Sequence, residues 1–272
     1  MFILKSIVII WLALTTTLSA GEIELSEKLW QNYRNHQRIP LISASQANLS
    51  IEQAYLVQTH YVKKRLADEK PAGFKAGLTS EAVQKKFKVN EALTGVLFAD
   101  GDLSHANSIQ LSQFKRLMLE TEIGFEVGTA ITSLLKNPDE LKRHIRAVFP
   151  VIELPELGFA NKPKGIDIIA ANVGAAAFIK GKAVTTEIDL NTLTVTLTKN
   201  GKIVNTGEGR DALGNQWKTA LWLVNTLIEN GWTLEVGQFF ITGALGQMIP
   251  CQVGNYQADF GKLGRISFSV VP

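Results

Sequence analysis

The strongest constraint on the fold is a run of alternating residues around an Asn-Gly pair, between residues 191 and 204. Leu193, Val195 and Leu197 alternate with threonines, and Asn200-Gly201 then interrupts the pattern. Alternation at period two around such a pair predicts two antiparallel strands joined by a tight turn. A chain with this hairpin is expected to place one face of an antiparallel sheet on a hydrophobic core.

Other stretches extend this pattern along the chain. Strand-like segments occupy residues 73–78, 119–127, 147–152, 238–242 and 265–270. Helical patterns occupy residues 26–36, 50–66, 80–87 and 217–228. Strands outnumber helices after residue 70, and hairpins rather than β-α-β units connect them. We therefore expect an α+β fold with an N-terminal helical segment at 21–70 and a curled, antiparallel catalytic domain at 71–272.

Composition excludes several classes of protein. The 272 residues are 46% hydrophobic, with 28 basic and 25 acidic side chains, so the chain can bury a large core and its charge does not indicate nucleic-acid binding. The single cysteine, Cys251, excludes an internal disulfide framework, and four scattered histidines give little support to a zinc site. Residues 207–212 match a dinucleotide fingerprint, but they follow a hairpin strand, so a tight turn is the favoured interpretation.

The first twenty residues form a separate prediction. Lys5 precedes an apolar run at residues 7–14, and small or hydroxylated residues lead to Ala20. As a helix the run would rise ~12 Å, well short of the ~30 Å hydrocarbon core, so a stable membrane span is not expected. The pattern predicts a cleavable signal at residues 1–20 and a periplasmic or secreted protein. An uncleaved anchor or a buried first helix stays open.

Carboxylates are the residues that most directly indicate chemistry. The expected strand at 119–127 places Glu120 and Glu122 on one face, ~7 Å apart. Glu153 ends the apolar stretch at 147–152. Carboxylate oxygens in such a group can bind hard divalent cations such as Mg²⁺ or Mn²⁺. The alternative is an ordinary solvated strand face.

Two further charged residues lie at the edges of apolar stretches. Lys75 lies between Gly73 and Gly77, where backbone can approach a ligand closely. Asp100 closes the apolar run that begins at Gly95. The simpler interpretations are a surface lysine and a turn aspartate.

Five short motifs occur in an order and spacing that resemble the 2-keto-4-pentenoate hydratase family of the fumarylacetoacetate hydrolase superfamily. They are Gly73–Thr79, Leu97–Asp100, Glu120–Ile123, Val151–Glu153 and Ile241–Gly246. The resemblance extends over nearly the whole chain from Ala54 onward. It implies a mixed β-roll, a homo-oligomer, and a lyase of aromatic catabolism that acts on a small 2-oxo or 2-hydroxydienoic acid.

The resemblance also implies roles for individual residues. A single Mg²⁺ or Mn²⁺ ion would be held by Glu120, Glu122 and Glu153. Lys75 and Asp100 would supply acid–base catalysis. The substrate would be bordered by Leu78, Ile123, Asn172, Thr242 and Gly243. The expected reaction is addition of water to a 2-hydroxy-2,4-dienoate to give a 4-hydroxy-2-oxo acid.

The chain departs from the family pattern at two places. Ala171 stands where many members have an acid before Asn172, and Asn215, Gln216 and Lys218 replace parts of a Gly-His-Pro-x-Asn segment. Family members usually work in the cytosol, so the expected signal is a further departure. Decarboxylation, acylpyruvate C–C hydrolysis, or an exported keto-acid binding protein without catalysis stay open as alternatives.

Overall fold

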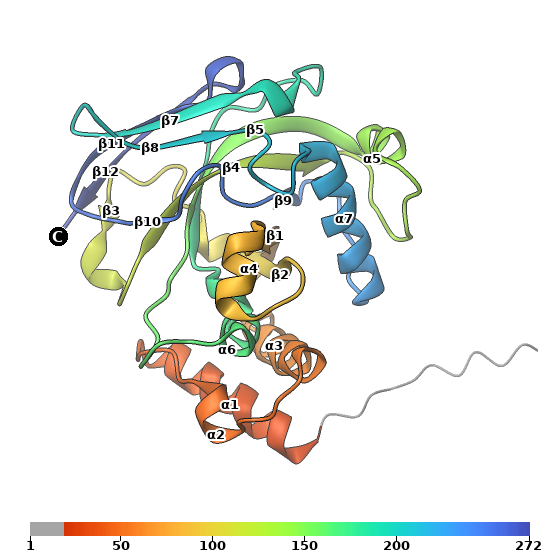
Figure 1. The fold of residues 1–272 in the computed structure, drawn as a ribbon, viewed down its shortest axis with the longest axis vertical. Coiled ribbons are helices and arrows are strands. Elements are labelled where there is room, and N and C mark those ends of the chain that lie inside the picture. The colour runs from red at the N-terminus through yellow and green to blue at the C-terminus, as the bar shows by residue number, and fades with distance from the viewer. Residues whose placement is uncertain (1–18) are drawn as a thin grey trace, which may run out of the picture.

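The computed structural model describes residues 19–272, which form two β-sheets with helices packed below and beside them (Figure 1). The larger sheet has seven strands and the smaller has five. The strands are joined largely as antiparallel pairs, with β1 parallel to β9 and β12 parallel to β3. The predicted α+β class is therefore confirmed.

The larger sheet runs in the order β2-β1-β9-β4-β5-β6, with β10 paired to β4. Its strands are β1 (Pro71–Gly77), β2 (Leu93–Phe98), β4 (Met118–Val127), β5 (Ile145–Leu154), β6 (Ala177–Lys180), β9 (Phe239–Ile241) and β10 (Ile249–Pro250). Strands β4 and β5 are its longest, and they carry mainly buried residues. They form the centre on which the acidic residues are arranged.

The smaller sheet runs in the order β3-β12-β11-β7-β8. Its strands are β3 (Ile109–Gln110), β7 (Thr194–Lys199), β8 (Lys202–Glu208), β11 (Gly254–Asp259) and β12 (Arg265–Val271). The predicted hairpin is the pair β7–β8, and Asn200 and Gly201 form its turn with φ values of 49° and 78°. The hairpin prediction is therefore confirmed, because both turn residues adopt the left-handed backbone that Asn and Gly tolerate best.

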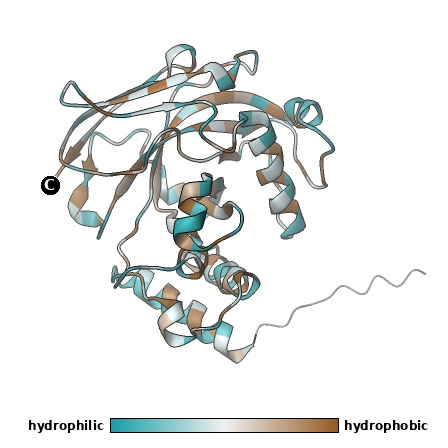
Figure 2. Cartoon of the chain, viewed as in Figure 1, coloured by the Kyte–Doolittle hydropathy of each residue, from teal (hydrophilic) through white to brown (hydrophobic). Residues whose placement is uncertain are grey.

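The helices surround these sheets. They are α1 (Ala20–Arg34), α2 (Ile42–Ser45), α3 (Ile51–Arg65), α4 (Glu81–Phe87), α5 (Pro138–His144), α6 (Gly165–Ala170) and α7 (Gln216–Glu229). Figure 2 shows hydrophilic and hydrophobic residues interspersed along the N-terminal helices, as expected for helices that bury one face. Ser50 caps α3 in a capping box with Gln53, as the sequence predicts.

The N-terminal helices share one hydrophobic core with the sheets. Apolar side chains from Leu25 in α1 to Val270 in β12 belong to a single buried cluster. Gln58 of α3 ties the two parts together, since its amide donates to the carbonyl oxygens of Thr94 in β2 (3.0 Å) and Ile169 in α6 (2.8 Å). The helical segment is thus packed directly against the strands that carry the site.

The expected signal at residues 1–20 lies almost entirely outside the described residues. Its last two residues, however, lie at the start of α1. Ser19 is the N-cap in a capping box with Glu22, and Ala20 is the first helical residue. Cleavage after Ala20 would remove this cap, which stabilises a helix by about 1 kcal/mol. Among the described residues, no helix has the length and apolar character needed to span a bilayer.

Candidate active site

The antiparallel pairing of β4 and β5 brings three carboxylates together. Glu120 lies directly opposite Glu153, and Glu122 follows two residues along β4 on the same face. One carboxylate oxygen from each residue lies within 4.8 Å of the others. Glu122 and Glu153 are fully buried, whereas Glu120 is half-buried. The predicted grouping is thus present, and it is not an ordinary solvated strand face.

Two oxygens of this group lack hydrogen-bond partners. Within residues 19–272, Glu122 Oε1 and Glu153 Oε2 are buried and accept no hydrogen bond. Such atoms are costly to bury unless something compensates them. Hard oxygen donors with free lone pairs at this spacing suit a divalent cation, so the residues present fit a bound Mg²⁺-type ion.

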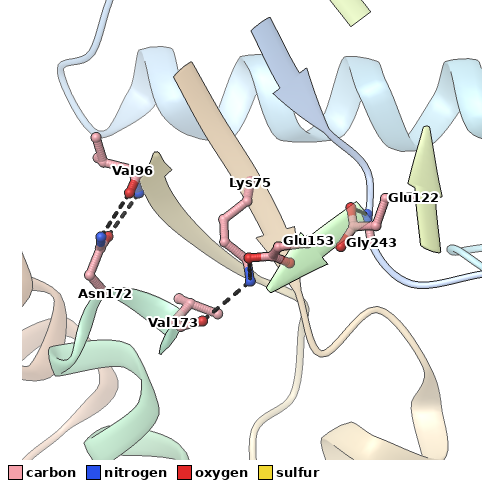
Figure 3. Close-up of polar contacts among 7 residues, drawn as sticks. All are labelled: Lys75, Val96, Glu122, Glu153, Asn172, Val173 and Gly243. Carbon is pink, nitrogen blue, oxygen red and sulfur yellow. Dashed lines mark hydrogen bonds and ion pairs between the residues drawn. The ribbon is translucent and has the colours of Figure 1, made fainter. Parts of the chain in front are cut away.

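Lys75 of β1 supplies the positive charge in the centre of the group. Its ammonium is 2% exposed and forms an ion pair with Glu153 (Figure 3). It also donates to the carbonyl oxygen of Val173 at 3.3 Å. Burial alone lowers the pKa of Lys75, but Glu153, Glu120 and Glu122 together raise it above its ordinary value. The lysine is therefore a buried, charged member of the site and not a surface residue.

The pKa values of two of the carboxyl groups are raised as well. Burial, followed by the Glu153 carboxylate, raises the pKa of Glu120 to about 8. Burial and the same neighbour also raise the pKa of Glu122. Three carboxylates and one ammonium share this enclosed space, so a proton on Glu120 or Glu122 lowers the repulsion among the carboxylates.

A left-handed turn at residues 172–174 contacts Lys75 through the Val173 carbonyl oxygen. Asn172, Val173 and Gly174 have φ values of 55°, 53° and 67°. This conformation is unfavourable for a β-branched residue such as Val173. The Asn172 amide fixes the turn, because it accepts from Val96 N and donates to Val96 O, each at 2.8 Å (Figure 3).

This turn explains two glycines near Lys75. A Cβ on Gly77 would lie 2.4 Å from a methyl group of Val173, and one on Gly95 would lie 2.9 Å from the Asn172 carbonyl oxygen. The sequence suggested that glycine near Lys75 admits a ligand. In the structure the Val173 side chain fills the space at Gly77, and the Asn172 backbone fills it at Gly95. Asn172 was expected to border the substrate, yet both of its amide groups are committed to Val96.

Thr242 and Gly243 lie at the other side of the carboxylates. The Gly243 N–H donates to Glu122 Oε2 at 2.7 Å, and Gly243 has a φ of 105° that favours glycine. The Thr242 hydroxyl donates to Gln216 Oε1 at 2.6 Å. Gly243 therefore orients a carboxylate, and the buried Thr242 connects that turn to helix α7.

Three other predicted residues make no hydrogen bond or ion pair with Lys75 or the three glutamates among residues 19–272. Ile123 alternates with Glu122 on β4, so its buried side chain joins the main hydrophobic core. Leu78 is half-buried with a φ of 51°, and its carbonyl accepts from Gln84 of α4. Asp100 is exposed in the 3₁₀ turn Ala99–Gly101.

Lys75 and Asp100, expected from the resemblance to act together in acid–base catalysis, are not brought together by the fold. Phe98, two residues before Asp100, pairs with Pro71 at the far end of β1. Pro71 is four residues from Lys75, or about 13 Å of strand. The charge partner of Lys75 is Glu153, and the sequence could not reveal this because the two residues meet only through strand pairing across the sheet.

A cavity of about 600 Å³ lies beside the left-handed turn at residues 172–174. It is enclosed by helices α1 and α3 and by residues 112–115. Ala171 and Gly174 line it, whereas Lys75 and the three glutamates do not. The carboxylate group is thus separate from this cavity, and its partly exposed member is Glu120.

Comparisons with known proteins agree with this geometry, although no family model matches the chain. A 2-keto-4-pentenoate hydratase from Paraburkholderia phymatum is 31% identical over 223 residues, which cover 79% of this chain and 85% of the relative. A 2-oxo-hept-4-ene-1,7-dioate hydratase from Escherichia coli is 27% identical, covering 89% of this chain and 95% of the relative.

Solved structures extend the likeness. The 4-oxalocrotonate decarboxylase from Pseudomonas putida G7, complexed with magnesium and adipate, is 26% identical with a TM-score of 0.87, covering 94% of this chain and 99% of that chain. A fumarylacetoacetate hydrolase family protein from Yersinia pestis CO92 is 14% identical with a TM-score of 0.57, covering 75% of this chain and 94% of that chain.

The two-sheet architecture with its acidic cluster thus has the fold of the fumarylacetoacetate hydrolase type. The chain belongs to the 2-keto-4-pentenoate hydratase family, and it is an enzyme of the hydro-lyase kind.

This membership corrects the prediction of a periplasmic or secreted protein. The prediction depended on a leader that ends at Ala20, whereas Ser19 and Ala20 begin a capped helix of the folded domain. The curated relatives match most of the chain and are named as hydratases of 2-keto-4-pentenoate and of 2-oxo-hept-4-ene-1,7-dioate. The assignment to an exported location is therefore withdrawn, and with it the exported binding protein.

Proposed function

We propose that the protein is a divalent-metal-dependent hydratase that adds water to a small 2-hydroxy-2,4-dienoate and yields a 4-hydroxy-2-oxo acid. The observation that carries this proposal is the enclosed group of Glu120, Glu122, Glu153 and Lys75, in which two buried oxygens have no partner among the described residues. The substrate class follows from the curated relatives, which are named as hydratases of 2-keto-4-pentenoate and of 2-oxo-hept-4-ene-1,7-dioate.

Glu120, Glu122 and Glu153 are the residues proposed to hold the metal. A bound Mg²⁺ or Mn²⁺ would supply a positive charge that stabilises negative charge on the C1 carboxylate and C2 oxygen of a 2-oxo acid. Magnesium is the first choice, because the related decarboxylase is described in complex with magnesium. The Gly243 N–H holds Glu122 Oε2, which leaves Oε1 free as a ligand.

The reaction has two steps, and each of them moves protons. Loss of the C2 hydroxyl proton and protonation at C5 convert the dienoate to an unsaturated 2-oxo acid. Water then adds across C3–C4, with its hydroxyl at C4 and its proton at C3. Lys75 Nζ is the group proposed to carry protons in these steps. It is charged, buried and held in place by Glu153 and the Val173 carbonyl.

A second candidate activity is decarboxylation of a 2-oxo acid on the same residues. It is favoured by the TM-score of 0.87 to 4-oxalocrotonate decarboxylase. Both reactions pass through an enolate next to the C1 carboxylate, so the same metal and lysine would serve either. The identity of the product distinguishes them.

The experiment is a turnover assay with purified protein, a 2-hydroxy-2,4-dienoate and added Mg²⁺ or Mn²⁺. We expect the dienoate absorbance to disappear, the activity to be lost on chelation, and Glu122→Gln to lower kcat by at least about a hundredfold.

Glu126→Gln is the matched control. Glu126 lies on the same face of β4, but it pairs with the exposed Arg146 outside the site, so its removal is expected to leave turnover near wild type. Absence of any dienoate turnover with either metal would contradict the proposal.

We also propose a homo-oligomeric enzyme, as the family resemblance implies. Light scattering of the purified protein tests this, and a monomer at micromolar concentration would contradict it.

A further inference from the structure

Gln216 lies in the segment that departs from the family pattern, and its place in the structure gives it a specific task. It is the first residue of α7, and its side chain is fully buried. Its Nε2 donates to the Gly209 carbonyl oxygen at 2.7 Å, and its Oε1 accepts from the Thr242 hydroxyl at 2.6 Å. One donor and one acceptor therefore fix the orientation of the amide.

Thr242 depends on this contact. Its hydroxyl is fully buried, and its other neighbour among the described residues is the Ile123 carbonyl oxygen at 3.4 Å, which is long for a hydroxyl donor. The hydroxyl therefore has a single good acceptor, Gln216 Oε1. Removing that acceptor would leave a buried polar group without a strong partner.

The next residue in the chain contacts the carboxylate group. The Gly243 N–H donates to Glu122 Oε2 at 2.7 Å, and the other oxygen of Glu122 has no partner within the described part of the chain (Figure 3). A shift of the Thr242–Gly243 turn would move this N–H. It would therefore change the orientation of the Glu122 carboxylate relative to Glu120 and Glu153.

We infer that Gln216 is a positioning residue for the metal site. It acts through Thr242 and Gly243 to orient Glu122, and it does not itself touch substrate or metal. The departure from the family pattern at this residue thus changes how the site is supported, not which side chains meet the substrate. The inference rests on the proposed function, because it takes Glu122 to be a metal ligand.

The test is calorimetric titration of Mg²⁺ and of Mn²⁺ into the full chain without substrate. Gln216→Met keeps the size of the side chain and removes both hydrogen bonds. We expect it to raise the metal Kd about tenfold to a hundredfold, as loss of a group that orients a metal ligand typically does. Thr242→Val should raise the Kd by a similar factor, and the double variant should be no worse than either single variant, since both remove one connection.

Two further variants separate positioning from general stability. Thr242→Ser keeps the hydroxyl and should retain a Kd close to that of wild type. Asn215→Ala removes the N-cap bond from Lys218 N at the same end of α7. It should lower the melting temperature while leaving the metal Kd unchanged.

The outcomes are distinguishable. Wild-type binding that persists in Gln216→Met and Thr242→Val, or an effect in the double variant equal to the product of the single effects, would overturn the inference alone. If Gln216→Met does not fold, Thr242→Val against Asn215→Ala decides the question. A wild-type protein that binds neither metal would overturn the proposed metal site together with the inference.

Discussion

At the scale of single residues, the main feature of the site is that its negatively charged groups outnumber its positively charged ones. Three carboxylates face one ammonium in a space where Lys75, Glu122 and Glu153 are at most 2% exposed. Burial of unbalanced charge is expensive, and the raised pKa values of Glu120 and Glu122 are its consequence. A divalent cation would balance the charge with all three carboxylates ionised.

Protons and metal should therefore compete for this site. Glu120 has a folded pKa of about 8, above its ordinary value of 4.5, so the folded protein binds protons that the unfolded chain has released. The metal-free protein should then lose stability as pH rises from about 5 to 8, and saturating Mg²⁺ should abolish this loss. Thermal unfolding at several pH values, with and without Mg²⁺, measures both effects. A metal-free melting temperature that rises across this range would contradict the account.

Replacing Lys75 should separate catalysis from metal binding. Lys75→Met removes the proton carrier but leaves the three carboxylates, so kcat should fall by at least about a hundredfold. Metal binding should persist, since the cation would then be the main partner of Glu153. Steady-state kinetics and calorimetric metal titration check the two parts. Retention of more than a tenth of wild-type kcat would exclude Lys75 as the acid–base group.

At the scale of elements, the left-handed turn at residues 172–174 connects β2 to Lys75. Asn172→Ala removes two buried hydrogen bonds to Val96, so we expect the free energy of unfolding to fall by about 1–3 kcal/mol. We also expect kcat to fall, because the Val173 carbonyl would no longer be held against the ammonium. Chemical denaturation and kinetics measure the two effects.

Asn225→Ala is the matched control for that variant. The Asn225 amide also makes two hydrogen bonds with one residue's backbone, accepting from Leu135 N and donating to Leu135 O, both at 2.9 Å. It lies on α7 and makes no contact with the carboxylate group. Asn225→Ala should thus lose comparable stability and keep its kcat. Equal losses of kcat in both variants would show that the turn has no specific role.

The strand register also predicts a preference among substrates. Val151, Phe178 and Ile241 pair directly with Glu122, Glu153 and Lys75. Directly paired residues share a face, so the carboxylates border a buried apolar cluster that also contains Leu97, Phe149 and Phe239. At its edge, Lys180 lies over the Phe178 and Phe239 rings, and Asp102 neutralises it at 2.8 Å.

A substrate tail on this face therefore meets apolar side chains and no unpaired buried cation among the described residues. A dienoate with a short alkyl tail should give a kcat/KM at least about tenfold higher than one with a terminal carboxylate, because an ionised group is costly to desolvate. Parallel kinetics with the two substrates measures the ratio. A preference for the dioate would contradict this prediction and would point to Lys180 as its partner.

At the scale of the whole molecule, local patterns predict the elements but not their meeting points. The alternation around Asn200-Gly201, the capping residues Ser50 and Gln53, and the glutamates on β4 are all readable because each depends on residues close in sequence. The resemblance predicted that Glu153 lies with Glu120. The register of β4 against β5 explains this grouping, because it pairs the two residues directly.

Contacts between distant segments account for what could not be predicted. The ion pair of Lys75 with Glu153, the support of Lys75 by Val173 and the link from Gln216 to Thr242 each join residues that are far apart in the chain. Nothing in the local sequence around Lys75 distinguishes Glu153 from Asp100 as its partner. At residues 1–20, in contrast, a local pattern led to a wrong prediction. The expected signal ends at Ala20, which is the first residue of a capped helix in the folded domain.

The fate of water in the reaction tests the central claim most directly. The metal-loaded enzyme is given a 2-hydroxy-2,4-dienoate in ¹⁸O-labelled water, and the product is examined by mass spectrometry and ¹³C NMR. The account predicts a 4-hydroxy-2-oxo acid that carries ¹⁸O at C4 and retains C1, formed only with Mg²⁺ or Mn²⁺ present. A product that carries no ¹⁸O at C4, or turnover unaffected by complete removal of metal, would contradict it.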